Sequence, residues 1–158
     1  MSLLKRQLLA DLPSEWPEGV LPDIQTLVRA DGRKVIVLDD DPTGTQTVAN
    51  IPVLTEWSVS SLCAELNNDF TEYYVLSNSR SLPEADAIQL NRDIGQKIVA
   101  ASRLTGRDFV IVSRGDSTLR GHFPAELDAL EAVLERFFVC CLVIPCFLEG
   151  VRFTIVVI

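Results

Sequence analysis

The sequence lacks the features that mark several common classes of protein. No apolar run reaches the roughly 18 residues that a membrane helix needs, and residues 1–10 have no long apolar core, so we expect neither a membrane span nor a signal peptide. A single histidine, His122, and four cysteines without a CxxC spacing argue against a zinc site. The 22 acidic residues outnumber the 14 lysines and arginines, giving a net charge of −8. This balance argues against nucleic acid or an anionic membrane as a partner.

Several catalytic and nucleotide-binding motifs are missing as well. The chain contains no GxxxxGK[ST] loop and no GxGxxG loop, so no nucleotide site is recognisable. It also lacks a GxSxG elbow for serine hydrolysis. Three of the four cysteines, Cys140, Cys141 and Cys146, lie in an apolar run. We interpret them as small buried side chains that stay reduced in a cytoplasmic protein.

The chain does have enough apolar residues for one domain with a core. It is 158 residues long and 47% hydrophobic. Short apolar runs rich in β-branched residues predict buried strands. These runs are Val35–Leu38, Tyr73–Leu76, Phe109–Val112 and Val139–Ile144.

Helical patterns separate the predicted strands, at residues 58–67, 82–104 and 122–138. Ser81, with Glu84 three residues later, predicts a capping box at the start of the second helix. Residues 1–30 are expected to be a helical lead-in, interrupted by Pro13, Pro17 and Pro22.

The alternation of strands and helices predicts an α/β fold with a parallel sheet covered on both faces, a three-layer sandwich in a single domain. Ligands of such sheets bind beyond the carboxyl ends of the strands. The loops 39–45, 77–81 and 113–122 follow the first three predicted strands, and each is dense in polar side chains. We therefore expect them to form one site, with the loop 145–150 beside them.

The first of these loops begins with three adjacent aspartates, Asp39, Asp40 and Asp41, followed by Pro42-Thr43-Gly44-Thr45. Neighbouring carboxylates raise each other's pKa unless cations or hydroxyls pair with them. Such a cluster can hold Mg²⁺, accept hydrogen bonds from substrate hydroxyls or act as a base. A solvated acidic turn is the structural alternative.

The third loop mixes an acceptor, hydroxyls and cations. It contains Arg114 and the segment Asp116-Ser117-Thr118-Leu119-Arg120-Gly121-His122. Arginines offer forked donors that fit a carboxylate or a phosphate, and Arg80 could reach the same place from the second loop. The alternatives are a helix cap with a salt bridge, and a structural role for His122.

Together these loops resemble the N-terminal domain of the four-carbon acid sugar kinase family, formerly a domain of unknown function. Members carry an Asp-Asp-x-Thr-Gly loop, an Asn/Thr-x-Arg-Ser loop and a Lys-x-x-Asp-Ser-Thr-Leu-Arg-Gly segment. The corresponding stretches here are 40–44, 78–81 and 114–121, with Arg114 near the position of the lysine. A Pro-x-Phe-x-x-Gly-Gly-Arg element resembles residues 145–152, but Val151 replaces a glycine.

The resemblance implies transfer of the ATP γ-phosphate to a hydroxyl of a threonate, an erythronate or a 3-oxo-tetronate. It implies that the N-terminal domain holds the sugar acid and that a C-terminal domain holds ATP and Mg²⁺. By this resemblance Asp41 and Asp116 are the candidate catalytic residues. The candidate substrate-binding residues are Asp40, Thr43, Gly44, Ser79, Arg80, Arg114, Ser117, Thr118, Arg120, Gly121 and His122.

Members of this family continue for more than a hundred residues beyond the position of Ile158, so we interpret residues 31–158 as an incomplete kinase without its nucleotide-binding domain. We expect such a chain to bind a sugar acid, to bind neither ATP nor a metal ion, and not to phosphorylate. An exposed interface for the missing domain would favour a homo-oligomer.

Two other interpretations are compatible with the sequence. Asp39-x-Asp41-x-Thr43 after a strand fits the nucleophile motif of a haloacid-dehalogenase-like phosphatase, in which Asp39 attacks phosphate and Asp41 is the acid or base, with Mg²⁺ as cofactor. Against it, no late lysine and Asp-Asp pair follow. The other possibility is a non-catalytic binding module or remnant.

Overall fold

The computed structural model describes residues 14, 19–134, 142–144 and 146. Helix α2 (Leu21–Asp31) precedes the central strand β1 (Lys34–Asp39). The other elements follow in the order η1 (Thr45–Thr47), β2 (Val53–Leu54), α3 (Val59–Asn67), β3 (Glu72–Leu76), η2 (Ser79–Ser81), α4 (Glu84–Thr105), β4 (Phe109–Arg114) and α5 (Ala125–Leu134). The predicted strands at 35–38, 73–76 and 109–112 are therefore confirmed.

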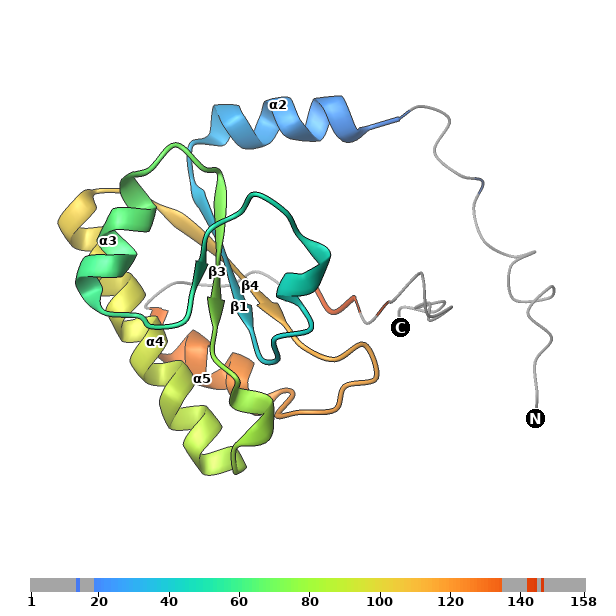
Figure 1. Cartoon of the computed structure of the whole chain (residues 1–158), viewed down its shortest axis with the longest axis vertical. Helices are drawn as coiled ribbons and strands as arrows, with labels where there is room; N and C mark the ends of the chain where they lie inside the picture. Colours follow the sequence, from blue (N-terminus) through green and yellow to red (C-terminus); the bar gives the residue numbers. More distant parts are fainter. Residues whose placement is uncertain (1–13, 15–18, 135–141, 145, 147–158) are drawn as a thin grey trace.

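The four strands form one parallel sheet in the order β2-β3-β1-β4. This confirms the predicted α/β class in a single domain. At the end of β1, Asp39 pairs with Leu76 of β3 on one side and with Arg114 of β4 on the other. Because all strands run in the same direction, their carboxyl ends meet at one edge of the sheet (Figure 1).

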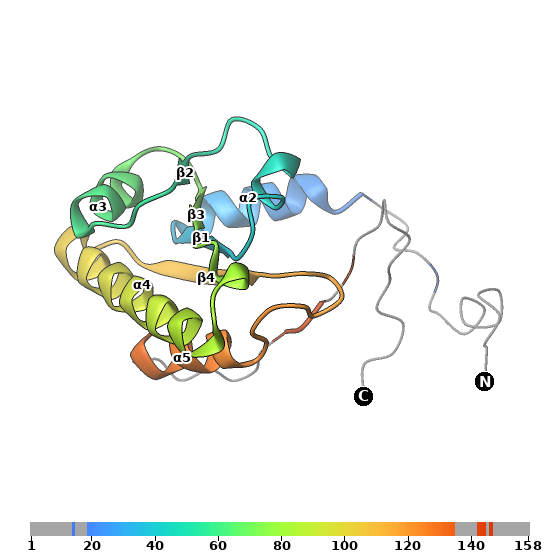
Figure 2. The same ribbon diagram turned by 60° about the horizontal axis from the view of Figure 1, so that its bottom comes forward.

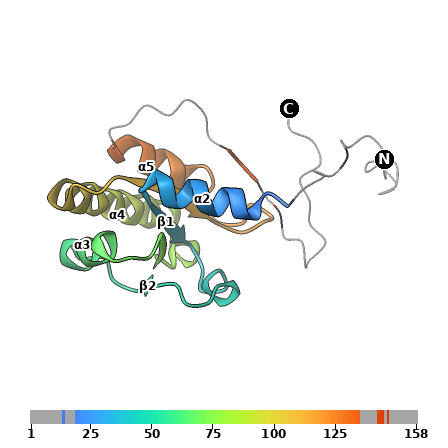
Figure 3. The ribbon, with the colours of Figure 1, turned by 90° about the horizontal axis from the view of Figure 1, so that it is seen from above.

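The hydrophobic core lies on one face of this sheet. Alternate residues of a strand point to the same face, and Ile36 and Leu38 of β1 share a core cluster with Leu62 of α3, Ile94 of α4 and Leu130 of α5. On the other side of the sheet lies η1, and α2 extends to this same side (Figures 2 and 3). No residue of α2 is buried, so among the described residues the helices of the core all belong to one layer.

The connections at the carboxyl edge leave the sheet in opposite directions. After β1 the chain turns to the side of η1 (Figure 2), whereas after β4 it leads to α5, which packs on α4. Since β1 and β4 are neighbours, the chain diverges between them at this edge, which is the place where open α/β sheets bind ligands.

Two predicted helix signals differ in the structure. Helix α3 confirms the helical pattern at 58–67 and is capped by Ser58, which accepts a hydrogen bond from the Ser61 N–H at 3.2 Å. The capping box at Ser81 is wrong, because the N-cap of α4 is Pro83 and the Ser81 hydroxyl donates to the Asn78 carbonyl. Pro22 does not interrupt the lead-in helix, since it lies in the first turn of α2, where a missing N–H costs nothing.

The apolar run at 139–144 does not form the predicted strand in its described residues, 142–144. Leu142, Val143 and Ile144 have no regular secondary structure and are exposed, Leu142 by 81%. Cys146 is also exposed, so its predicted burial is wrong as well. Residues 135–141, 145 and 147–158 lie outside the described residues, as do 1–13 and 15–18, and with them Cys140, Cys141 and most of the loop 145–150.

Candidate functional site

Backbone hydrogen bonds join the three predicted loops at the carboxyl edge of the sheet. The Asp40 N–H donates to the Arg114 carbonyl at 3.2 Å, and the Arg80 N–H donates to the Asp40 carbonyl at 3.2 Å. The Ser77 N–H and hydroxyl both donate to the Asp39 carbonyl, at 2.9 and 3.0 Å. The loops after β1, β3 and β4 therefore form one rigid platform, as their positions in the sequence predict.

The strongest side-chain link in this platform is the ion pair between Arg80 and Asp40. Arg80 donates two parallel hydrogen bonds, from Nε to Asp40 Oδ2 at 3.0 Å and from Nη2 to Oδ1 at 2.7 Å. Its Nη1 lies 3.4 Å from Asp41 Oδ2. Asp40 is 6% exposed, so a bidentate partner is needed to compensate its desolvation. Arg80 thus binds two of the three aspartates.

Asp41 closes the turn that follows β1. Its Oδ1 accepts hydrogen bonds from the Thr43 N–H, at 2.8 Å, and from the Thr43 hydroxyl. These bonds stabilise the charged form and lower the pKa of Asp41. Asp41 is therefore an ionised acceptor at neutral pH, suited to orient a hydroxyl group.

The third loop has a similar internal arrangement around Asp116. This carboxylate accepts hydrogen bonds from Arg120, at 2.8 and 3.0 Å, and from the N–H and hydroxyl of Thr118. The Arg120 guanidinium, followed by Thr118, holds the pKa of Asp116 well below its usual range. Arg120 itself is largely exposed, and its side chain remains at the surface.

Gly121 places this third loop against the other two. A Cβ atom at Gly121 would lie 3.1 Å from Asp40 Oδ2 and 3.7 Å from the Arg80 side chain, and Gly121 has a φ of +110°, which favours glycine. His122 follows; its carbonyl accepts the Glu126 N–H, and its buried Nε2 has no hydrogen-bond partner among the described residues. Ser117 lies in the same loop, whereas Ser79 is buried with its hydroxyl 3.1 Å from that of Ser77.

The prediction from sequence missed two contributors to this edge. Thr47 of η1 accepts a hydrogen bond from Arg114 Nη2 at 3.3 Å. Asp39, which the sequence placed in the acidic cluster and in the phosphatase alternative but not among the candidate substrate-binding residues, lies with its Oδ2 3.6 Å from Arg114 Nη1. Strand alternation could have identified Asp39, since it shares a face with Val35 and Val37, away from the core.

Burial raises the pKa of Asp39 to about 6, although Arg114 opposes the rise. In the folded chain the Asp39 carboxyl group therefore keeps its proton at pH values where an ordinary aspartate, with a pKa of 3.8, has lost it. By linkage, ionisation of Asp39 destabilises the folded state increasingly as the pH rises from 4 to 6.

Asp39→Asn, which cannot ionise, should therefore be more stable than the wild type at pH 7 and not at pH 4. We expect the free energy of unfolding to increase by about 1–2 kcal/mol at pH 7. This is less than the full increase that the raised pKa of Asp39 implies, because Arg114 loses its counter-charge in the variant. Urea denaturation at pH 4, 5, 6 and 7 measures it. A gain that is the same at every pH would contradict the assignment.

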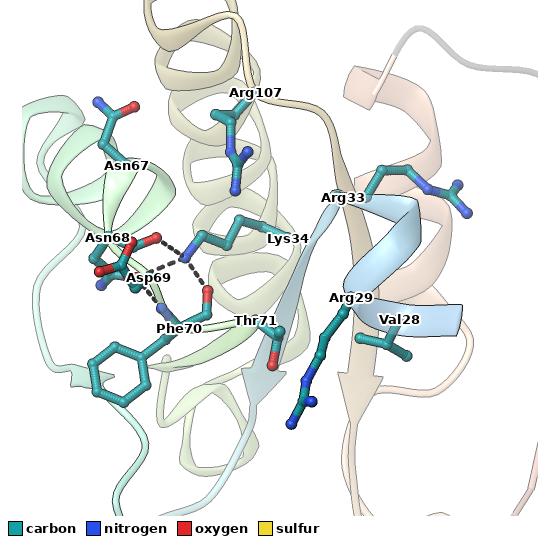
Figure 4. A pocket seen from close by; sticks show the side chains of 11 residues that line it. Val28, Arg29, Arg33, Lys34, Asn67, Asn68, Asp69, Phe70, Thr71 and Arg107 are labelled. Carbon is teal, nitrogen blue, oxygen red and sulfur yellow. Dashed lines mark hydrogen bonds between the residues drawn. The ribbon is translucent and has the colours of Figure 1, made fainter. Parts of the chain in front are cut away.

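A separate hollow of about 380 Å³ lies at the opposite, amino-terminal edge of the sheet (Figure 4). Buried Lys34 donates from Nζ to the Asn68 carbonyl, at 2.8 Å, to Asn68 Oδ1 and to the Phe70 carbonyl. These three bonds use all its donors and fasten the loop before β3 to the start of β1. The hollow contains none of the predicted site residues.

Within the described residues, no group of three histidine, cysteine or acidic side chains is arranged to hold a metal ion. None of the described helices is both long and apolar enough to cross a membrane. The platform offers arginines, which can pair with a carboxylate, and carboxylates and hydroxyls, which can accept hydrogen bonds.

Residues 35–156 match the family model of the sugar-binding N-terminal domain. This chain belongs to that family. It is the N-terminal domain of the four-carbon acid sugar kinase family, which confirms the resemblance seen in the sequence. No curated protein matches the chain. In this sugar-binding domain the match includes every predicted site residue from Asp40 to His122, while α2 and Lys34 precede it.

Proposed function

We propose that this domain binds a four-carbon sugar acid, such as a threonate, an erythronate or a 3-oxo-tetronate, at the carboxyl edge of its sheet. The observation that supports this is the assembly of arginines and aspartates from three loops on one platform, within a domain of a sugar-binding family. A sugar acid has one carboxylate and several hydroxyl groups, and this platform has cations for the former and acceptors for the latter.

The contacts suggest separate tasks for these side chains. Arg80 and Arg120 each donate two hydrogen bonds to an aspartate, whereas among the described residues Arg114 donates a single side-chain hydrogen bond, to Thr47. Arg114 is therefore our first choice for the substrate carboxylate. Asp41 and Asp116, both with a lowered pKa, would accept hydrogen bonds from substrate hydroxyls and orient the one that attacks.

We propose that the sugar acid is the acceptor in a phosphoryl transfer from ATP. The described residues do not fit ATP or Mg²⁺, since no three of their histidine, cysteine or acidic side chains are arranged to hold a metal ion and the chain has no phosphate-binding glycine loop. We therefore assign both to a separate nucleotide-binding domain of the family, and the role of this domain is to hold and align the attacking hydroxyl. A cytoplasmic location and self-association are further parts of this proposal.

Isothermal titration of the chain with threonate and erythronate isomers tests the proposal. We expect at least one isomer to bind, and Arg114→Ala to weaken that binding at least tenfold, because a charged hydrogen bond contributes about 1.5–3 kcal/mol. Asp93→Asn, which changes an α4 carboxylate paired with Lys97, is the control and should bind as the wild type does. If none of these acids binds, the proposed function is wrong.

The phosphatase alternative makes a different prediction. Its nucleophile would be Asp39, which is 1% exposed and lies beneath the buried Gly44. This position gives a phosphate ester no route to the carboxylate. Hydrolysis of p-nitrophenyl phosphate by the wild type, abolished in Asp39→Asn, would favour the phosphatase.

A further inference from the structure

Asp39 and Arg114 form an ion pair whose position follows from the sheet register. The two residues are paired on the neighbouring parallel strands β1 and β4, so their side chains point to the same face. Asp39 Oδ2 and Arg114 Nη1 are 3.6 Å apart, and both atoms are buried without a hydrogen-bond partner among the described residues. The pair is held together by charge and burial alone.

The turn after β1 covers this pair. A Cβ atom at Gly44 would overlap both oxygens of Asp39 and Arg114 Nη1, so the backbone of the turn lies directly on the two charges. Thr47, further along the same turn, accepts a hydrogen bond from Arg114 Nη2. Arg114 is thus fixed from two sides, while 34% of its side chain remains exposed.

The charged groups around Asp39 come from three elements. Arg114 of β4 lowers its pKa, as does the Asp41 N–H, while the neighbouring carboxylates Asp40 and Asp41 raise it, each by less than burial does. From β3, the pKa of Tyr74 is raised mainly by burial, with Arg114 and Asp39 contributing in opposite directions. With its pKa raised to about 6, Asp39 is therefore balanced between its charged and neutral forms near pH 6.

We propose that Asp39 is a positioning residue that competes with the bound sugar acid for Arg114, so that binding of the acid takes up a proton at Asp39. This rests on the proposed function. When Asp39 is ionised, it neutralises Arg114 and repels a second carboxylate. When Asp39 is neutral, the positive charge of Arg114 is available to the ligand. By reciprocity, a ligand that prefers the neutral form promotes protonation.

Isothermal titration at pH 7 in two buffers of different ionisation enthalpy measures the proton directly, with the isomer of threonate or erythronate that binds. We expect uptake approaching one proton per bound acid, and affinity that falls up to tenfold per pH unit above pH 6. At pH 7 about a tenth of Asp39 carries a proton, so Asp39→Asn should bind about tenfold more tightly, without proton uptake. Asp93→Asn should retain the uptake of the wild type.

A second measurement needs neither a ligand nor a variant. In the wild-type chain, the side-chain ¹⁵N resonances of Arg114 should titrate together with the Asp39 carboxyl ¹³C resonance, with a midpoint near pH 6. If Arg114 does not follow Asp39, or if the acid binds without proton uptake, the positioning role is wrong. If Arg114 follows Asp39 but no sugar acid binds to any variant, the coupling is supported and the proposed function fails.

Discussion

Arg80→Ala should lower the free energy of unfolding by about 3 kcal/mol at neutral pH. The substitution leaves Asp40, whose side chain is 7% exposed, without its two hydrogen bonds at 2.7 and 3.0 Å. An uncompensated buried charge is the main cost, since breaking a buried ion pair typically costs about 3–5 kcal/mol. The lower end of this energy range applies here because the Arg80 side chain is still 24% exposed to solvent. Urea denaturation gives the change.

Two matched variants separate burial from the mere loss of an ion pair. Arg120→Ala removes an equally bidentate pair, with Asp116, in which the arginine side chain is 70% exposed; the Asp116 side chain is 9% exposed but keeps the hydrogen bonds from the Thr118 N–H and hydroxyl. We expect a loss below about 1 kcal/mol there. Adding Asp40→Asn to Arg80→Ala removes the unpaired charge and should restore part of the stability. Equal losses for Arg80→Ala and Arg120→Ala would contradict the cost assigned to the unpaired charge of Asp40.

Gly44→Ala should distort the carboxyl edge of the sheet and abolish sugar-acid binding. Gly44 has an ordinary helical φ of −63°, so its backbone conformation does not require glycine. The requirement is space, because a methyl group would overlap the Asp39 carboxylate and Arg114 Nη1, both buried and fixed by the strands beneath them. The turn must move instead, at a cost of about 1–3 kcal/mol.

Gly115→Ala is the matched control for this substitution. Gly115 belongs to the same platform, but a methyl group there would lie 3.7 Å from Asp40 Oδ2, an ordinary contact distance. Circular dichroism and titration with the sugar acid should show a folded, binding-competent Gly115→Ala. A Gly44→Ala protein that binds the acid as well as the wild type does would show that the turn is free to move.

The location of the site could be predicted from the sequence because it depends on a general property of parallel sheets. Three apolar runs ended in polar loops, and the carboxyl ends of parallel strands share an edge. The partners within the site could not be predicted, since they depend on the strand order. Only when β4 lies beside β1 does Arg114 face Asp39, and only when β3 lies on the other side does Arg80 reach Asp40.

The errors in the fold have the same origin. Strand β2, with only Val53 and Leu54, is too short for any apolar pattern, and backbone pairing with β3 defines it. The run at 139–144 has a strand-like pattern, yet residues 142–144 are exposed and irregular. Apolar content describes a residue's preference for burial, whereas a strand also needs a neighbouring backbone with free hydrogen-bonding groups.

Strand β1 carries a buried charge at each of its ends, Lys34 and Asp39, both 1% exposed. Each charge has partners that only one register of β1 against its neighbouring strands supplies. Lys34 has the carbonyls of Asn68 and Phe70, and Asp39 has Arg114. Slipping the strand by one residue would move it about 3.3 Å and turn each charge to the opposite face. The two charges therefore fix the register of the central strand, and the alignment of the proposed ligand-binding edge depends in part on a lysine at the far end of the sheet.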